Sequence, residues 1–109
     1  MGKNIDNFNK DTLGLLLEFI STIIFITLII NKNTLLLGIS FLIFSIYISG
    51  LDKIQKISTF NSHLNPAVTL GILFKKGDYH SWIPFLTIFV QIIACFIAAM
   101  IVKKIEKVN

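Results

Sequence analysis

Long uncharged runs of apolar residues constrain this chain more than any other feature of its sequence. Residues 34–51 and 83–102 carry no charged side chain, and residues 13–30 carry one, Glu18. A helix needs about 20 residues, and at least about 17, to cross a hydrocarbon core of about 30 Å. All three runs are 18 to 20 residues long and meet this requirement. A fourth run, residues 64–74, has 11 residues and is too short to cross.

The composition excludes most soluble classes of protein. Of the 109 residues, 54% are hydrophobic and 15% are charged, whereas a soluble domain is roughly a quarter charged and at most half apolar. A soluble domain of this size buries only about two-thirds of its surface, so it could not cover this many apolar side chains. An open sheet would leave amides unpaired in lipid. We therefore expect an all-α membrane protein, integral and multi-pass, in a membrane that the sequence does not identify.

The chain divides into a polar N-terminal segment, residues 1–11, which we expect to fray, and a single membrane domain, residues 12–109. The predicted transmembrane helices lie at about residues 12–30, 34–51 and 83–102. The first two are separated by only three residues, Asn31-Lys32-Asn33. So short a connection forces the two helices into an antiparallel hairpin.

The charge pattern favours anchoring in a lipid bilayer over binding to nucleic acid. The chain has ten lysines, no arginine and six acidic residues, for a net charge of +4. The lysines sit in short groups between the apolar runs, whereas a nucleic-acid binder clusters its charge on one face and usually includes Arg. Cys95 is the single cysteine, so it has no intrachain disulfide partner. No catalytic or metal-binding motif is present, and we expect neither an enzyme nor a cofactor.

The short run predicts a helix that begins at Pro66. Asn65 is of a residue type preferred at the N-cap, and Pro is preferred at the first helical position. Two lysines follow at the C-terminal end, where cations suit the helix dipole, and Gly77 follows them as a stop. A helix this short between two spans is a candidate re-entrant half-helix, at about residues 65–74, reached by a loop at residues 52–61.

A re-entrant half-helix would leave its positive N-terminal end at the bilayer centre. Such an end opposes the entry of cations. The Asn65 carboxamide oxygen can cap the helix while its NH2 group donates to a water or polyol hydroxyl. Alternatively, Asn-Pro is only the start of a helix in a connecting loop. Its position before a short apolar run, between two spans, favours the pore interpretation.

The eight residues 63–70, HLNPAVTL, resemble the signature loop of the major intrinsic proteins, the aquaporin and glycerol-facilitator family. EFIST at residues 18–22 is similar to the Glu-Phe-x-Gly-Thr of that family's first helix, with Ser21 in place of Gly. Gln91, with alanines three, seven and eight residues later, is similar to the pattern of its third helix. The order of span, span, half-helix and span matches the first half of the family fold. The resemblance covers most of the chain.

The resemblance implies that four residues line a pore or set its selectivity: His63, Asn65, Pro66 and Ala67. It also implies that Glu18 accepts hydrogen bonds from the re-entrant loop, with Thr22 and Gln91 as further structural support. From the residues alone, Glu18 either joins a buried network or lies near the interface. His63 either lines the pore mouth or bonds the loop backbone.

The chain departs from the family pattern in three ways. Family members contain two inverted halves, and only one is present here. Their selectivity filter usually includes an Arg after the second signature, and this chain has no Arg. The approach loop, ISTFNSH, is about two residues longer than the usual Ile-Ser-Gly-x-His. That length leaves the filter position of the second helix open among Ile43, Phe44 and Ser45.

The predicted function is that of a half-channel subunit for passive passage of water or small neutral solutes such as glycerol. An inverted copy or a second-half channel partner would complete the pore. In the predicted topology, six lysines lie on the side of the membrane that holds the N-terminus and four lie on the opposite side. This small difference gives only a weak bias in orientation, which is compatible with an inverted copy. The alternative is a truncated, non-conducting membrane protein, either a relic or a modulator of a full-length channel.

Overall fold

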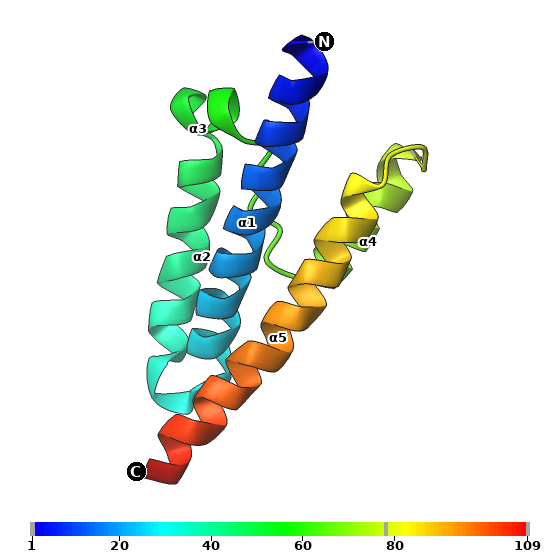
Figure 1. Ribbon diagram of the computed structural model, residues 1–109. Helices are drawn as coiled ribbons and strands as arrows, with labels where there is room; N and C mark the ends of the chain where they lie inside the picture. The colour runs from blue at the N-terminus through cyan, green and yellow to red at the C-terminus, as the bar shows by residue number, and fades with distance from the viewer. Residues whose placement is uncertain (1, 78, 109) are drawn as a thin grey trace.

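The described part of the chain is helical, with loops between the helices and no strand (Figure 1). A computed structural model describes residues 2–77 and 79–108, and the side chains of residues 8–77 and 79–107. The elements are α1 (Gly2–Ile30), the single 3-10 turn η1 (Lys32–Thr34), α2 (Leu35–Ser49), α3 (Asp52–Ile57), α4 (Pro66–Lys76) and α5 (Ile83–Val108).

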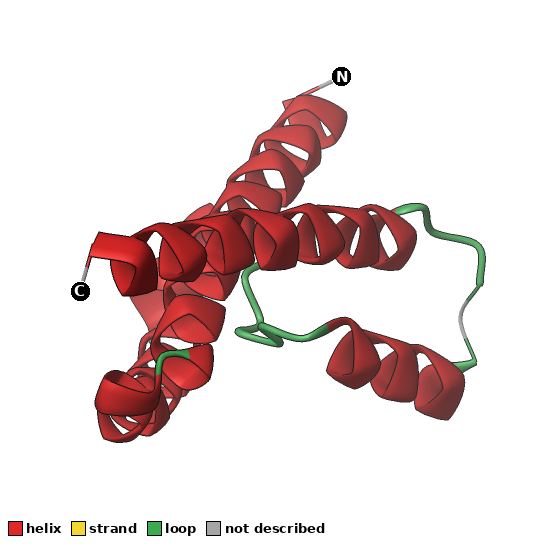
Figure 2. Cartoon of the chain, turned by 90° about the horizontal axis from the view of Figure 1, so that it is seen from below, coloured by secondary structure: helices red, strands yellow, loops and turns green. Residues whose placement is uncertain are grey.

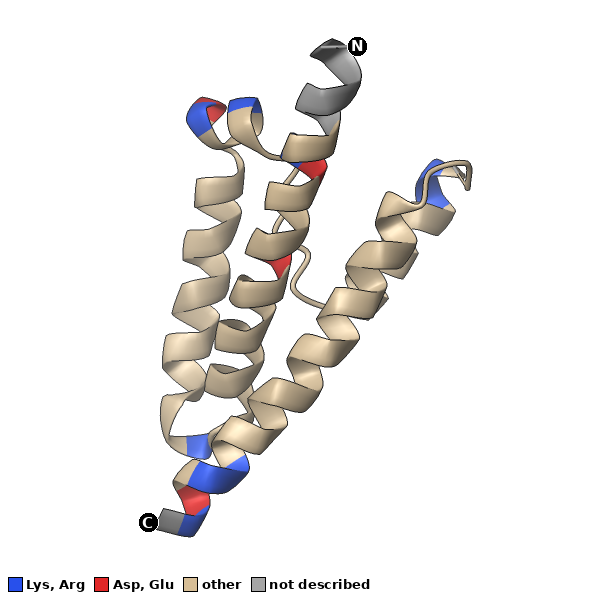
Figure 3. Cartoon of the chain, viewed as in Figure 1, with Lys and Arg blue, Asp and Glu red and all other residues tan. Residues whose placement is uncertain are grey.

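Three of these helical segments are long and apolar enough to cross a membrane: Phe8–Ile30, Lys32–Ser49 and Ile83–Lys107. Figure 3 shows that the charged residues gather at the two ends of the long helices, and that the zone between them carries a single acidic segment, midway along α1. The prediction of an all-α chain with three potential spans is confirmed. The arrangement is compatible with a multi-pass integral membrane protein.

Helix α1 begins earlier than the sequence analysis expected. It starts at Gly2 and continues through the polar segment that we expected to fray. Residues 3–12 contain neither Pro nor Gly, so nothing in the segment interrupts the backbone. Extending an existing helix adds about one hydrogen bond for each residue that becomes ordered, which is much easier than starting a new one.

Helices α1 and α2 form the predicted antiparallel hairpin (Figure 1). The side chain of Asn31 caps the turn by accepting a hydrogen bond from the Asn33 amide over 3.1 Å. Gly38 allows the two helices to approach closely, because a Cβ atom there would lie 2.9 Å from the Ile29 side chain and 3.1 Å from its backbone nitrogen. The hairpin therefore depends on one cap and one small residue.

Helix α5 packs along α1 and makes the most extensive helix pair of the described chain. Seen from below, the two helices cross (Figure 2). Ala94 and Ala98 of α5 are completely buried, as is Thr22 of α1. Small residues at such a crossing let two backbones approach closely, which is the usual way that helices associate in membranes.

Helix α4 begins at Pro66, as the sequence predicts, and ends two residues later than expected. The Asn65 side chain accepts a hydrogen bond from the Ala67 amide over 2.8 Å, and Gly77 ends the helix in a left-handed conformation with φ +69°. Helix α4 lies antiparallel to α5 and packs against no other described helix (Figures 1 and 2). Helix α3, in the connection leading to α4, was not predicted.

Candidate functional site

The segment between α3 and α4, residues 58–65, is defined here as the loop, and it runs alongside α1. The Thr59 amide donates to the carbonyl oxygen of Lys10 over 3.2 Å, and the His63 amide donates to Glu18 over 2.7 Å. Lys10 and Glu18 are eight residues apart, or about 12 Å along the helix axis. Four extended residues cover about 13 Å. The loop therefore follows α1 between these two attachment points, although Ser62, which lies between them, departs from an extended conformation with φ +56°.

Gly14 makes this close approach possible. A Cβ atom at Gly14 would lie 2.5 Å from the Thr59 hydroxyl, 3.0 Å from the Thr59 carbonyl carbon and 3.1 Å from the Phe60 amide nitrogen. Distances this short leave no room for any larger residue unless the loop backbone moves. A glycine at this position is thus required by the path of the loop.

Glu18 meets the loop near the middle of the first potential span. It lies ten residues from Phe8 and twelve from Ile30 in the segment Phe8–Ile30, which corresponds to about 15 Å and about 18 Å along the axis. Its side chain is only 4% exposed. Of the two interpretations of Glu18, the buried network is the one that this position fits.

The Glu18 carboxylate is held by three donors. It accepts from the amides of His63 (2.7 Å) and Leu64 (3.1 Å), and from the Gln91 side chain (3.3 Å). Leu64 has φ +59°, a left-handed conformation, and successive amides in such a turn form a concave anion-binding nest. A buried carboxylate is tolerable only when hydrogen bonds replace its lost hydration. These three donors meet that need.

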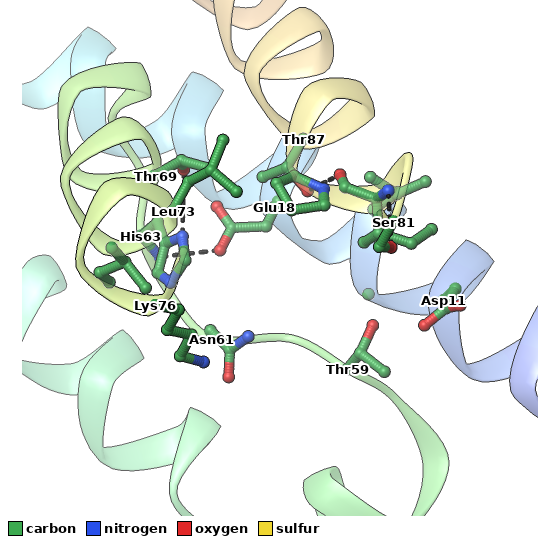
Figure 4. A pocket seen from close by; sticks show the side chains of 15 residues that line it. Asp11, Glu18, Thr59, Asn61, His63, Thr69, Leu73, Lys76, Ser81 and Thr87 are labelled. Carbon is green, nitrogen blue, oxygen red and sulfur yellow. Dashed lines mark hydrogen bonds between the residues drawn. The ribbon is translucent and has the colours of Figure 1, made fainter. Parts of the chain in front are cut away.

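The network continues through Thr69, to which the sequence analysis gave no role. The Thr69 hydroxyl donates to the Gln91 carboxamide oxygen over 3.1 Å and lies 3.0 Å from Nδ1 of His63. Glu18, Gln91, Thr69 and His63 therefore form a closed ring of hydrogen bonds that joins α1, α5, α4 and the loop; Figure 4 shows Glu18, His63 and Thr69 together. The only sequence signal for the role of Thr69 is its position, one helical turn after the N-cap residue Asn65.

Helix α2 holds the loop through a second contact. The hydroxyl groups of Ser45 and Ser62 lie 2.6 Å apart, and both residues are buried. Ser62, like Leu64, has a positive φ, +56°, and a residue held this way costs about 1–3 kcal/mol unless its surroundings stabilise it. Of the three positions left open in α2, Ser45 contacts the loop, whereas Ile43 and Phe44 are 64% and 59% exposed.

The loop presents a polar edge that the sequence analysis missed. Its even-numbered residues, from Ser58 to Leu64, are buried, whereas the odd-numbered ones are exposed or half-buried. We call this exposed edge the polar track; it consists of Thr59, Asn61, His63 and Asn65. The alternation of polar residues at every second position is the sequence signal that predicts it, because extended chains have a period of two.

The backbone of the loop also has unused hydrogen-bonding capacity. None of the carbonyl groups of residues 58–64 accepts a hydrogen bond from another described residue. The Asn65 carboxamide uses its oxygen to cap α4, and no described residue accepts a hydrogen bond from its NH2 group. The loop carbonyls and the Asn65 NH2 group therefore have no hydrogen-bond partner within the described residues.

A cavity of about 320 Å³ lies against the polar track (Figure 4). Its walls include the first three residues of the track and polar side chains of three helices: Asp11 and Glu18 in α1, Thr69 and Lys76 in α4, and Thr87 in α5. Burial is the main influence on the His63 ring and lowers its pKa; Glu18 opposes this shift, and Lys76 adds to it.

The structure brings together only some of the residues predicted to act in a pore. His63 lines the cavity and bonds Thr69 through its ring. Asn65, Pro66 and Ala67 do not line the cavity; they form the start of α4, where Asn65 and Ala67 are exposed.

The three residues predicted to support the loop also differ in what they contact. Glu18 and Gln91 both belong to the ring of hydrogen bonds. Thr22 is completely buried, yet its hydroxyl group has no hydrogen-bond partner among the described residues and so makes no hydrogen bond to the loop. Among the described residues, no group of three or more His, Cys, Asp or Glu side chains is placed to hold a metal ion.

Comparisons with protein-family models, with curated proteins and with solved structures found no match to this chain. Its function has to be inferred from the geometry of the loop, the cavity and α4.

Proposed function

We propose that this chain is one half of a membrane channel through which water or small neutral solutes, such as glycerol, pass by diffusion. The observation that carries this proposal is the loop, whose free carbonyl groups and polar track meet α1 at Glu18, midway along a potential span. Irregular backbone at membrane depth is tolerated only where it is buried in protein or lines a water-filled cavity. The exposed edge of the loop therefore calls for a water-filled path beside it.

In this proposal α4 is a re-entrant half-helix. Its 11 residues rise by about 16 Å, roughly half of a hydrocarbon core of about 30 Å. Its first turn follows directly on the residues bound to Glu18, and its last turn carries two exposed lysines. Tyr79 and Trp82, in the turn that follows, are 54% and 78% exposed, and such aromatic residues are enriched at membrane interfaces. These features support a path in which the loop and α4 enter the membrane and leave it again on the same side.

The chemistry of this half favours neutral, hydrogen-bonding solutes. The carbonyl groups of the loop accept hydrogen bonds, and the Asn65 NH2 group donates one. A helix N-terminus carries about half of a positive charge, so the start of α4 opposes cations. A molecule that can both donate and accept, such as water or an alcohol, suits both kinds of group.

We further propose that the chain is related to the aquaporin and glycerol-facilitator family. Support comes from HLNPAVTL at residues 63–70 and from the bonds that Glu18 and Gln91 make to the loop and to Thr69. The proposed relation to this family rests on these residues.

A second half is required, because three long helices and α4 leave the polar track open on one side. We propose that an inverted copy of this chain supplies it. Lysines gather at both ends of the long helices (Figure 3), and orientation in a membrane follows the difference in Lys and Arg between the two sides. A small difference permits insertion in both directions, which an inverted pair requires.

Replacing Asn65 tests the proposal. Asn65→Asp keeps the capping oxygen but exchanges the NH2 donor for a negative charge, so neutral-solute flux should be lost or fall at least tenfold in the conducting assembly. Asn33→Asp makes the same chemical change in the exposed turn between α1 and α2, and its flux should equal that of the wild type. Unchanged water flux and unchanged exclusion of ions in Asn65→Asp would contradict the assignment.

A further inference from the structure

We propose that the cavity beside the loop is a binding site for small neutral molecules that carry an O–H or N–H donor, and that Nε2 of His63 is the acceptor at this site. The ligand class deepens the proposed function and rests on it. The protonation pattern of His63 on which the site depends does not rest on it, because that pattern can be measured whether or not the chain conducts.

The ring of hydrogen bonds determines which group donates at each contact, starting from Glu18. Both carboxylate oxygens of Glu18 accept from backbone amides, those of His63 and Leu64, and the Gln91 side chain turns its NH2 group toward Oε2. The carboxamide oxygen of Gln91 then faces Thr69 and accepts its hydroxyl proton over 3.1 Å; the other acceptor of that hydroxyl, the Asn65 carbonyl oxygen, is farther away at 3.5 Å. The Thr69 oxygen has lone pairs left but no further proton to give.

The remaining contact of the ring therefore has to use a proton of His63. Nδ1 of His63 lies 3.0 Å from the Thr69 oxygen, which has already donated its proton to Gln91. Nδ1 must carry a hydrogen and donate it. In a neutral imidazole only one nitrogen is protonated, so Nε2 keeps its lone pair and acts as an acceptor.

The free nitrogen is available to a molecule in the cavity. His63 is one of the residues that line it, and no described residue forms a hydrogen bond with Nε2. Figure 4 shows the His63 ring between Thr69 and Lys76. A lone pair with no partner among the described residues is an acceptor for an O–H or N–H group of a ligand.

The other walls of the cavity favour a neutral ligand of small size. The charged residues that line it beyond the ring are Asp11 of α1 and Lys76 of α4, and they have opposite signs. The volume of about 320 Å³ is many times the roughly 30 Å³ that one water takes in the liquid. Such a space accommodates several waters or one three-carbon polyol, whose hydroxyl groups can donate to His63.

Nitrogen NMR of the histidine side chains tests the protonation pattern directly. The chain has two histidines, so a His80→Gln variant labelled with 15N-histidine reports on His63 alone. In lipid bilayers at pH 8, we expect Nδ1 to be protonated and Nε2 to be unprotonated. The reverse pattern, with the proton on Nε2, would overturn the proposal.

A pair of variants at Thr69 shows whether the ring sets this pattern. Thr69→Val removes the hydroxyl group and should move the proton to Nε2, which a free imidazole prefers. Thr69→Ser keeps the hydroxyl and should keep the proton on Nδ1. If Thr69→Val leaves Nδ1 protonated, the ring does not control His63 and the proposal fails.

Glycerol serves as the probe for the ligand. Added to the same labelled protein, it should shift the Nε2 resonance and leave Nδ1 nearly unchanged, since only Nε2 accepts from the ligand. No shift at Nε2 up to molar glycerol would overturn the binding site. A third outcome separates the two proposals. If the protonation pattern and the glycerol shift are as expected but vesicles containing the protein do not conduct, the proposed channel function is refuted and the proposed binding site is retained.

Discussion

The crossing of α1 and α5 and the attachment of the loop are built on different physical principles. At the crossing, Ala94, Ala98 and Thr22 are completely buried, and complementary shape is the main requirement, since each helix satisfies its own backbone hydrogen bonds; the bond from Gln91 to Glu18 also joins these two helices. The loop has no such internal bonds. It is held by individual side chains, above all Glu18, Gln91 and Thr69 in the ring and Ser45 in α2.

The difference teaches where the molecule is sensitive to substitution. Close packing at the crossing is shared among many contacts, so a small change there is spread over many atoms. At the loop, one carboxylate serves three donors, and the loss of one side chain leaves several buried groups unpaired. We therefore expect the largest effects of conservative substitutions at the attachments of the loop.

Glu18→Gln should have the largest effect. It removes the charge and turns a donor toward groups that are themselves donors, the His63 or Leu64 amide or the Gln91 NH2. One buried unpaired group costs roughly 1–3 kcal/mol, so a loss of about 3 kcal/mol in the free energy of unfolding is expected. Denaturation of the protein in mixed micelles measures it. The control Glu106→Gln lies at an exposed position and should change stability little; equal effects in both variants would refute the role of Glu18.

Gly14→Ala should have the next largest effect. The added Cβ atom meets the Thr59 backbone at 3.0 Å, so the loop must move away from α1. Overpacking of this kind costs about 1–3 kcal/mol. Gly71→Ala in α4 is the matched control, since nothing lies within 4 Å of a Cβ atom there, and alanine in a helix interior should stabilise by roughly 0.5–1 kcal/mol. Unfolding in the same micelles should give opposite signs, and the same sign in both would contradict the account.

Ser45→Ala tests the attachment to α2. It leaves the buried Ser62 hydroxyl without its partner at 2.6 Å and should destabilise by about 1 kcal/mol. Amide hydrogen exchange of the loop should accelerate, while exchange at the crossing of α1 and α5 stays the same. Ser40→Ala, at an exposed serine that bonds only within its own helix, should leave both rates unchanged. Equal acceleration at both regions in Ser45→Ala would show that they are not independently held.

The last comparison is between two buried threonines, one from each region, and the smallest effect is expected at Thr22. Thr22→Val removes a hydroxyl that has no partner and should be neutral or stabilise by up to about 1 kcal/mol. Thr69→Val breaks the ring and should destabilise by about 1–2 kcal/mol, since it removes partners from His63 and Gln91. Thermal unfolding of the two variants side by side measures the contrast. Destabilisation by Thr22→Val as large as that by Thr69→Val would remove the distinction between the regions.

The sequence predicts the parts of this fold that local chemistry determines. The three long helices follow from the length of the uncharged runs, and the start of α4 follows from the Asn65-Pro66 pair and its end from Gly77. The attachment of Glu18 to His63 joins residues 45 apart in the chain. No local pattern encodes such a contact, and only the resemblance to a known family implied it.

The conformation of the loop and the role of Thr69 could not be predicted from the sequence, for physical reasons. Ser62 and Leu64 adopt positive φ values although neither is Gly, so their conformation is imposed by bonds to Ser45 and Glu18 from distant helices. Thr69 appears as an ordinary residue of a short helix. The polar track was predictable in principle, because polar residues occupy every second position from Thr59 to Asn65, although the polar Ser62 between them interrupts the alternation.

The most direct test of the central claim is water flux measured by stopped-flow light scattering on liposomes that contain only this purified chain. If an inverted copy completes the channel, shrinkage should be clearly faster than in empty vesicles, should return to background in Asn65→Asp and should persist in Asn33→Asp. Background flux from the wild type, with the protein shown to be folded and inserted in both orientations, would contradict the claim.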